Sequence, residues 1–254
     1  MPQLRTSKDF QPLQRLRFCY LCAQPILPDE PRNREHVPPH AVFLKEHRGP
    51  SLWLPAHVTC NSEKSGSDEK MGQLIDMLHG KTPSNHRFRR LALDEKVGGV
   101  RALNIEYEVA RWIRGMHAAL YEEPLADMAR MILTIPFVKW VDGVGVTPLR
   151  PEHEQAVMLI KKNRAAGRLD CISMNSGKFI YECVWGKDAD DLWVCAFAMN
   201  LYDWKDLGHL SHGPARGCAG FYYAADFSKP ALATVETSLI IPHQNFDPLD
   251  PFGS

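Results

Sequence analysis

The chain is organised around residues Phe18–Glu69, which read FCYLCAQPILPDEPRNREHVPPHAVFLKEHRGPSLWLPAHVTCNSEKSGSDE. Cys19 and Cys22 open this stretch, and His57 and Cys60 stand near its far end. The two-residue spacing inside each pair lets both side chains turn onto one ion, and four such ligands complete a tetrahedral zinc shell. We therefore expect these four residues to bind a structural Zn²⁺. The alternative is a set of free thiols beside a chance histidine.

A second set of polar residues lies between and directly after the zinc-type pairs. Glu35 and His36 begin the run Glu-His-Val-Pro-Pro, and Asn61 directly follows Cys60, so closure of the zinc site would fix the position of Asn61. Carboxylate and amide oxygens suit Mg²⁺ or Mn²⁺ better than zinc. The imidazole of His36 is then left for proton transfer, for which an ordinary histidine pKa of about 6.5 is suitable at neutral pH.

This order of motifs resembles the HNH endonucleases, also called the ββα-metal or His-Me finger group, in its zinc-stapled form. The resemblance covers about residues 19–80. It implies that His36 is the general base that takes a proton from the attacking water, and that Glu35 and Asn61 hold one catalytic Mg²⁺ or Mn²⁺. Asp68 could add a further metal ligand, although acidic residues in the first turn of a helix are common for capping reasons alone.

Two positions depart from the family pattern. His57 stands where the family usually has a cysteine, and no asparagine lies between Asn33 and Asn61 to orient His36. Imidazole is an acceptable zinc ligand, so the first departure leaves the zinc site intact. The second departure leaves the residue that orients His36 unassigned, with a backbone carbonyl as one option.

Prolines and apolar spacing predict the elements of the chain. Prolines forbid a helix through residues 34–43 and 52–59, which we expect to be extended and to pair as a ribbon. Helical spacing and end signals predict four helices, at residues 67–80, 103–121, 125–133 and 151–166. Composition predicts four main strands, at residues 179–185, 192–201, 217–227 and 232–241. Residues 1–17 have the character of a polar lead-in.

The expected fold class is therefore α+β. A zinc-stapled ββα-metal (HNH) domain would occupy residues 1–82, and helices followed by a mostly antiparallel sheet would occupy residues 83–254. The four cysteines outside the opening stretch fall in segments that have the character of buried strands or loops, and we expect them to pack in the core. They are Cys171, Cys183, Cys195 and Cys218.

Charge and hydropathy limit the partners. The formal net charge of the 254 residues is zero, which argues against a protein held on nucleic acid by bulk electrostatics. Residues 1–120 nevertheless carry 18 Lys and Arg against 13 Asp and Glu, as a phosphate-handling site would need. Residues 1–11 contain no apolar run, and no later stretch is long enough to span a membrane. We expect a cytoplasmic protein without a membrane partner.

The leading hypothesis is a metal-dependent endonuclease that hydrolyses phosphodiester bonds in nucleic acid, with double-stranded DNA as the expected substrate. Restriction or anti-phage defence is a biological setting suggested by family analogy alone. Basic residues that could contact the nucleic acid are Arg87, Arg89, Arg90, Arg111 and Arg114. The acidic C-terminal region would select the target or bind a protein partner.

The alternative is a non-catalytic zinc-stapled module that binds nucleic acid or protein. A third option, an enzyme site on His209 and His212, is weak because no carboxylate has a suitable spacing.

Overall fold

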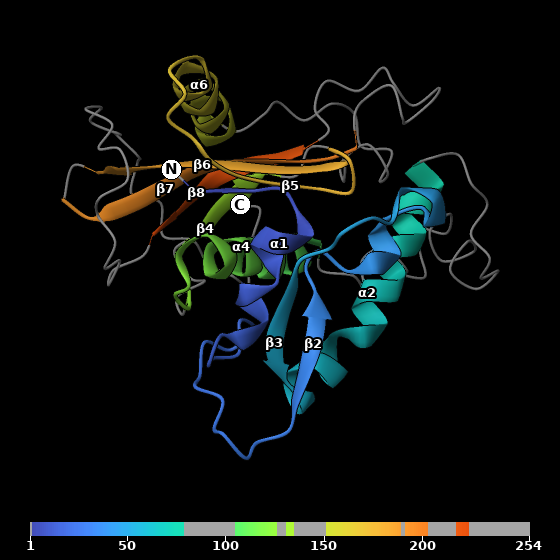
Figure 1. The fold of residues 1–254 in the computed structure, drawn as a ribbon. Helices are drawn as coiled ribbons and strands as arrows, with labels where there is room; N and C mark the ends of the chain where they lie inside the picture. The colour runs from blue at the N-terminus through green and yellow to red at the C-terminus, as the bar shows by residue number, and fades with distance from the viewer. Residues whose placement is uncertain are drawn as a thin grey trace, which may run out of the picture.

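A computed structural model gives the fold of the chain (Figure 1). It describes residues 2–78, 105–125, 131–134, 151–188, 191–202 and 217–223. Two sheets organise these residues, one of six strands and one of two. The expected α+β class with a mostly antiparallel sheet is confirmed. Among the described helices, none is long and apolar enough to cross a membrane.

The two-stranded sheet is an antiparallel ribbon of β2 (Arg32–His36) and β3 (Trp53–His57). Helix α2 (Val58–Leu78) follows β3 without a loop and runs beside the ribbon (Figure 1). The sequence predicted this helix only from Ser67, so the prediction of its start was wrong. The polar segment before Ser67 has no apolar stripe to signal a helix, but it also contains no proline that would interrupt one.

The six-stranded sheet has the order β1-β5-β6-β7-β8-β4, in which β1 and β5 are parallel and every other pair is antiparallel. Its strands are β1 (Gln3–Leu4), β4 (Met131–Thr134), β5 (Asp170–Met174), β6 (Phe179–Lys187), β7 (Trp193–Leu201) and β8 (Gly217–Tyr223). Residues 131–133 were predicted to be helical. They form an edge strand instead, because pairing with Ala219–Tyr222 outweighs a weak local helix signal. The strand predicted at 232–241 lies outside the described residues.

Two long helices cover the six-stranded sheet from opposite sides (Figure 1). Helix α6 (Pro151–Ala165) packs on one face, and helix α4 (Ile105–Tyr121) lies on the other, between the sheet and the ribbon. The bounds of both helices agree with the predicted ranges, 103–121 and 151–166, to within about two residues. Trp112, Ile113, Met116 and Ala119 of α4 are all buried, since this helix is covered from two sides.

The N-terminal residues are part of the fold rather than a polar lead-in. β1 pairs with β5, and the short helix α1 (Ser7–Phe10) and the 3₁₀ turn η1 (Pro12–Arg15) bury Phe10 and Leu13. One cluster of buried side chains runs from Phe10 through the ribbon and α4 to the sheet. The proposed boundary at residue 82 lies outside the described residues and stays a prediction. The four remaining cysteines lie in β5–β8 and are buried, as expected.

Gly72 of α2 lies directly against the chain between the ribbon strands. A Cβ at this position would lie 2.6 Å from the carbonyl oxygen of Ala41. We expect Gly72→Ala to lower the free energy of unfolding by about 1–3 kcal/mol, because backbone has to move to admit the methyl group. Gly66→Ala in the same helix is the matched control, since nothing lies within 4 Å and alanine should add about 0.5–1 kcal/mol. Equal changes for both variants in urea denaturation would contradict this packing.

Candidate metal centre and ribbon site

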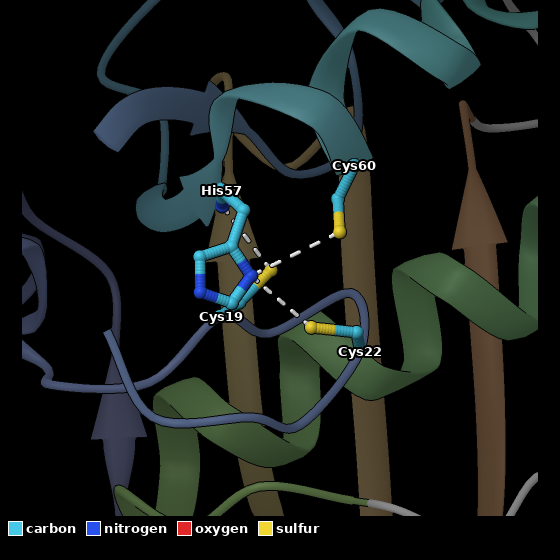
Figure 2. Close-up of side chains that lie close together, drawn as sticks. All are labelled: Cys19, Cys22, His57 and Cys60. Carbon is cyan, nitrogen blue, oxygen red and sulfur yellow. Dashed lines mark hydrogen bonds between the residues drawn. The ribbon is translucent and has the colours of Figure 1, made fainter. Parts of the chain in front are cut away.

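Three thiols and one imidazole converge where the start of α2 meets the N-terminal knuckle, residues 19–22 (Figure 2). The ligand atoms of Cys19, Cys22, His57 and Cys60 all lie within 4.8 Å of one another. The Nδ1 atom of His57 is 3.3 Å from the sulfur of Cys22 and 3.9 Å from that of Cys60. Tetrahedral zinc with bonds of about 2.0–2.3 Å requires ligand atoms roughly 3.5–3.8 Å apart. The cluster could therefore bind a structural metal such as zinc.

Local backbone bonds shape the knuckle before any metal is considered. The N–H of Ala23 donates to the carbonyl of Cys19 (2.8 Å), and the N–H of Cys19 donates to the carbonyl of Gln24 (2.9 Å). Ala23 has a left-handed backbone (φ 65°), which closes the turn. The N–H of Tyr20 donates to the carbonyl of Pro55, so the knuckle is held against β3. The cysteine pair is thereby placed opposite the end of that strand.

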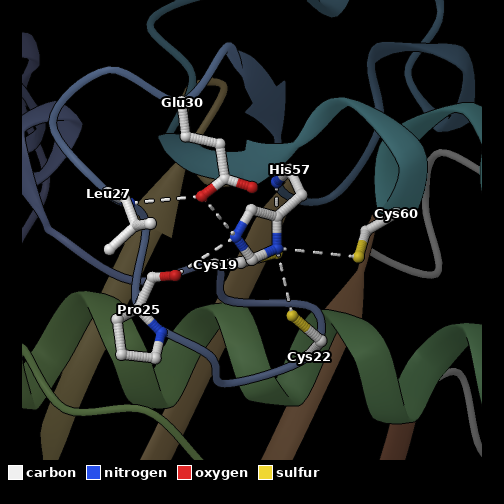
Figure 3. A network of polar contacts seen from close by, with 7 residues as sticks. All are labelled: Cys19, Cys22, Pro25, Leu27, Glu30, His57 and Cys60. Carbon is white, nitrogen blue, oxygen red and sulfur yellow. Dashed lines mark hydrogen bonds and ion pairs between the residues drawn. The ribbon is translucent and has the colours of Figure 1, made fainter.

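Two oxygen acceptors orient the ring of His57 on the side away from the thiols (Figure 3). Its Nε2 atom lies 3.3 Å from the carbonyl oxygen of Pro25 and 3.5 Å from a carboxylate oxygen of Glu30. Donation of the Nε2 proton to these acceptors leaves the Nδ1 lone pair facing the thiols, which is the arrangement of a metal-bound histidine with outer acceptors. Sequence reasoning missed Glu30, because an acidic residue in a proline-rich connector has no distinguishing spacing.

The three thiols lie so close together that their ionised forms would repel one another, and a cation between them would remove this repulsion. Burial, reinforced by the charges of Cys19 and Cys22, raises the pKa of Cys60 to about 12. Burial also raises the pKa of Cys19. The pKa of Cys22 is lowered, because hydrogen bonds to its sulfur outweigh the opposing effect of burial. Three adjacent thiolates repel one another, whereas a divalent cation at their centre favours the ionised form of each.

Glu35 lies on the side of the ribbon that carries the buried residues Leu54 and Ala56, because it pairs with Leu54 across the strands. Burial strongly raises the pKa of Tyr20, and the charges of Glu35 and Asp68 raise it further. Both carboxylates are therefore near enough to Tyr20 for their charges to act on its hydroxyl. Asn61 is half-buried in the first turn of α2, two helical turns before Asp68.

His36 points to the opposite side of β2, since successive side chains of a strand alternate. Its ring is half-buried between His40 and Trp53. Glu35 thus faces the buried side of the ribbon, and His36, the next residue and the last of β2, faces the other side. Catalytic roles for Glu35, His36 and Asn61, and a metal-ligand role for Asp68, stay predictions.

The predicted nucleic-acid contacts on α4 have partners inside the protein. Arg111 is buried and forms an ion pair with Glu108 (3.1 Å). Burial raises the pKa of Glu108, and the charge of Arg111 opposes that shift. Arg114 donates to the carbonyl of Leu21, inside the knuckle. A phosphate contact from either arginine stays a prediction. The other predicted contacts, Arg87, Arg89 and Arg90, lie outside the described residues, as do His209 and His212.

No protein-family model, curated protein or solved structure matches the chain.

We expect the purified protein to contain zinc, and Cys22→Ser and Cys60→Ser to reduce the zinc content strongly, because each removes one ligand of the cluster. The zinc content per chain is measured after dialysis by inductively coupled plasma mass spectrometry. Chelation should also lower the melting temperature, since metal binding and folding are coupled. Cys218→Ala is the matched control, because this buried thiol lies in β8 and should leave the zinc content unchanged. Full zinc content in both ligand variants would contradict the assignment.

Proposed function

We propose that the chain is an HNH-type endonuclease that hydrolyses phosphodiester bonds in double-stranded DNA. The observation that carries the proposal is the order of elements around the ribbon. An antiparallel pair ends its first strand with Glu35 and His36, and a helix that follows the second strand directly has Asn61 in its first turn. The cysteine and histidine cluster joins this same first turn to the N-terminal knuckle.

Glu35 and Asn61 would hold one Mg²⁺ or Mn²⁺, with Asp68 as an additional carboxylate nearby. These oxygen donors are appropriate for a hard cation. When bound, such a cation supplies Lewis acidity to the scissile phosphate. His36 would accept the proton of the attacking water as a neutral imidazole. Zinc on the four-ligand cluster would have a structural role only.

The surface beside His36 supports an anionic substrate. Arg32 and Arg34 are exposed and alternate with Asn33 and Glu35 along β2, so they share the ribbon face of His36. Two guanidinium groups on this face can contact phosphates without reading bases. Base selection would then come from another part of the chain or from a protein partner. A role in restriction or anti-phage defence is the biological setting that we propose for such an enzyme.

Cleavage of DNA tests the proposal directly. We expect Mg²⁺- or Mn²⁺-dependent cutting of plasmid DNA by the wild-type protein, and a loss of about 10²–10⁴-fold in rate for His36→Ala, as for removal of a general base. Asn61→Ala should raise the metal concentration needed for cutting. Met158→Ala, an exposed change on α6, is the control and should cut normally. If the wild type cuts no better than His36→Ala with either metal, the enzyme proposal fails and a non-catalytic zinc-stapled module takes its place.

The arginines of β2 allow a separate test of nucleic-acid binding. We expect the double variant Arg32→Ala/Arg34→Ala to bind DNA more weakly and to reduce the slope of log K against log salt by about one for each lost phosphate contact. Lys161→Ala/Lys162→Ala removes the same charge from exposed positions on α6 and is the matched control. The same loss of affinity in both double variants, measured by fluorescence anisotropy, would indicate a general charge effect instead of a contact surface.

A further inference from the structure

The ring of His36 is held between two other rings. The centroid of His40 lies 3.4 Å away with the planes inclined by 27°, and that of Trp53 lies 3.5 Å away on a tilt of 43°. Trp53 is the cross-strand partner of His36, and His40 begins the 3₁₀ turn η2 (His40–Val42) just after β2. Rotation of the His36 ring about its Cβ–Cγ bond would bring it into both neighbours. The pair therefore fixes the plane of the ring.

His40 is itself held by a hydrogen-bonded chain. Its Nε2 atom lies 2.7 Å from the hydroxyl of Ser51, and this hydroxyl donates its single proton to the carbonyl of Gly49 (3.1 Å). While this hydroxyl donates to Gly49, it can accept a proton from the Nε2–H tautomer of His40. One serine hydroxyl thus sets both the position and the orientation of His40.

The segment that carries these residues, 37–52, is attached to the six-stranded sheet at two points. The N–H of Gly49 donates to Oδ1 of Asn175 (2.8 Å), and the N–H of Leu44 donates to the hydroxyl of Tyr202 (2.7 Å). Asn175 and Tyr202 are buried and follow directly after β5 and β7, both with a left-handed backbone. The N–H of Tyr202 donates to the carbonyl of Lys178, which joins the two turns.

We propose that His40 is the positioning residue for His36, and that the sheet keeps His40 in place through Asn175, Gly49 and Ser51, with Tyr202 as a second anchor. The orientation that the sequence left unassigned is thus supplied by ring contacts and a serine, in place of an asparagine. The C-terminal sheet acquires a role in the site itself. The effect on catalysis rests on the proposed function, whereas the fixed ring of His36 does not.

Nuclear magnetic resonance of histidine-labelled protein tests the fixed ring without any activity. His36→Ala identifies the His36 ring signals, which in the wild type should be displaced by the ring currents of Trp53. Ser51→Ala and Tyr202→Phe each delete one oxygen, and His40→Ala removes the stacked ring. We expect all three to move or broaden the His36 signals. Ser62→Ala and Tyr107→Phe delete comparable oxygens from α2 and α4 and should leave the signals in place.

Kinetics supply the second measurement. If the protein cuts DNA, Ser51→Ala and Tyr202→Phe should lower kcat about 10–100-fold with an unchanged Kd for DNA, because misplacement of the base affects chemistry and leaves binding intact. Zinc content and the melting curve show that each variant is folded. Unchanged His36 signals in folded Ser51→Ala and Tyr202→Phe would overturn the proposal. Absence of cutting by the wild type would overturn the nuclease proposal alone, since the resonance result decides the fixed ring by itself.

Discussion

Three sulfur atoms and one imidazole nitrogen have to share one small volume, and most of the N-terminal architecture follows from that requirement. Two of the thiols come from the knuckle, the imidazole from the end of β3 and the third thiol from the first turn of α2, so the cluster joins segments about forty residues apart. Zinc on such ligands contributes about 10–16 kcal/mol. That is comparable with the whole free energy of folding of a typical domain, about 5–15 kcal/mol. With a metal bound, the cluster would join the knuckle to the end of β3 and to the first turn of α2, which contains Asn61.

The second organising feature is α4, which is packed on both sides. Toward the ribbon, a Cβ at Gly115 would lie 2.4 Å from Cγ1 of Val37, so the side chain of Val37 packs directly against the helix at this glycine. Toward the sheet, the hydroxyl of Tyr121 donates to Asp170 (2.8 Å) and accepts from the indole of Trp185 (2.7 Å). Burial raises the pKa of Asp170, although the bond from Tyr121 opposes that shift. These polar contacts are directional, so α4 holds the ribbon at one orientation above the sheet.

The four-ligand cluster and strands β6, β7 and β8 could be predicted because they have short-range signals. Two-residue ligand spacing identifies the cluster, and a strand-type composition identifies β6 and β7. The start of α2 and strand β4 were predicted wrongly because their state depends on partners distant in the sequence. Glu30 and Ser51 could not be singled out, since an isolated acidic residue or serine acquires meaning only from the side chain that it contacts.

The sequence by itself determined the chemistry available to this protein: a soft-ligand set for a structural metal, and a neighbouring carboxylate, imidazole and amide. Residue type and spacing suffice for that, because coordination preference is a property of the side chains. Only the tertiary structure decided how the side chains of these groups are oriented. Glu35 and His36 diverge to opposite faces of β2, and the ring of His36 is fixed by His40 and Trp53. The segment that carries His40 donates hydrogen bonds to Asn175 and Tyr202, more than a hundred residues away along the chain, and no local pattern can encode such contacts.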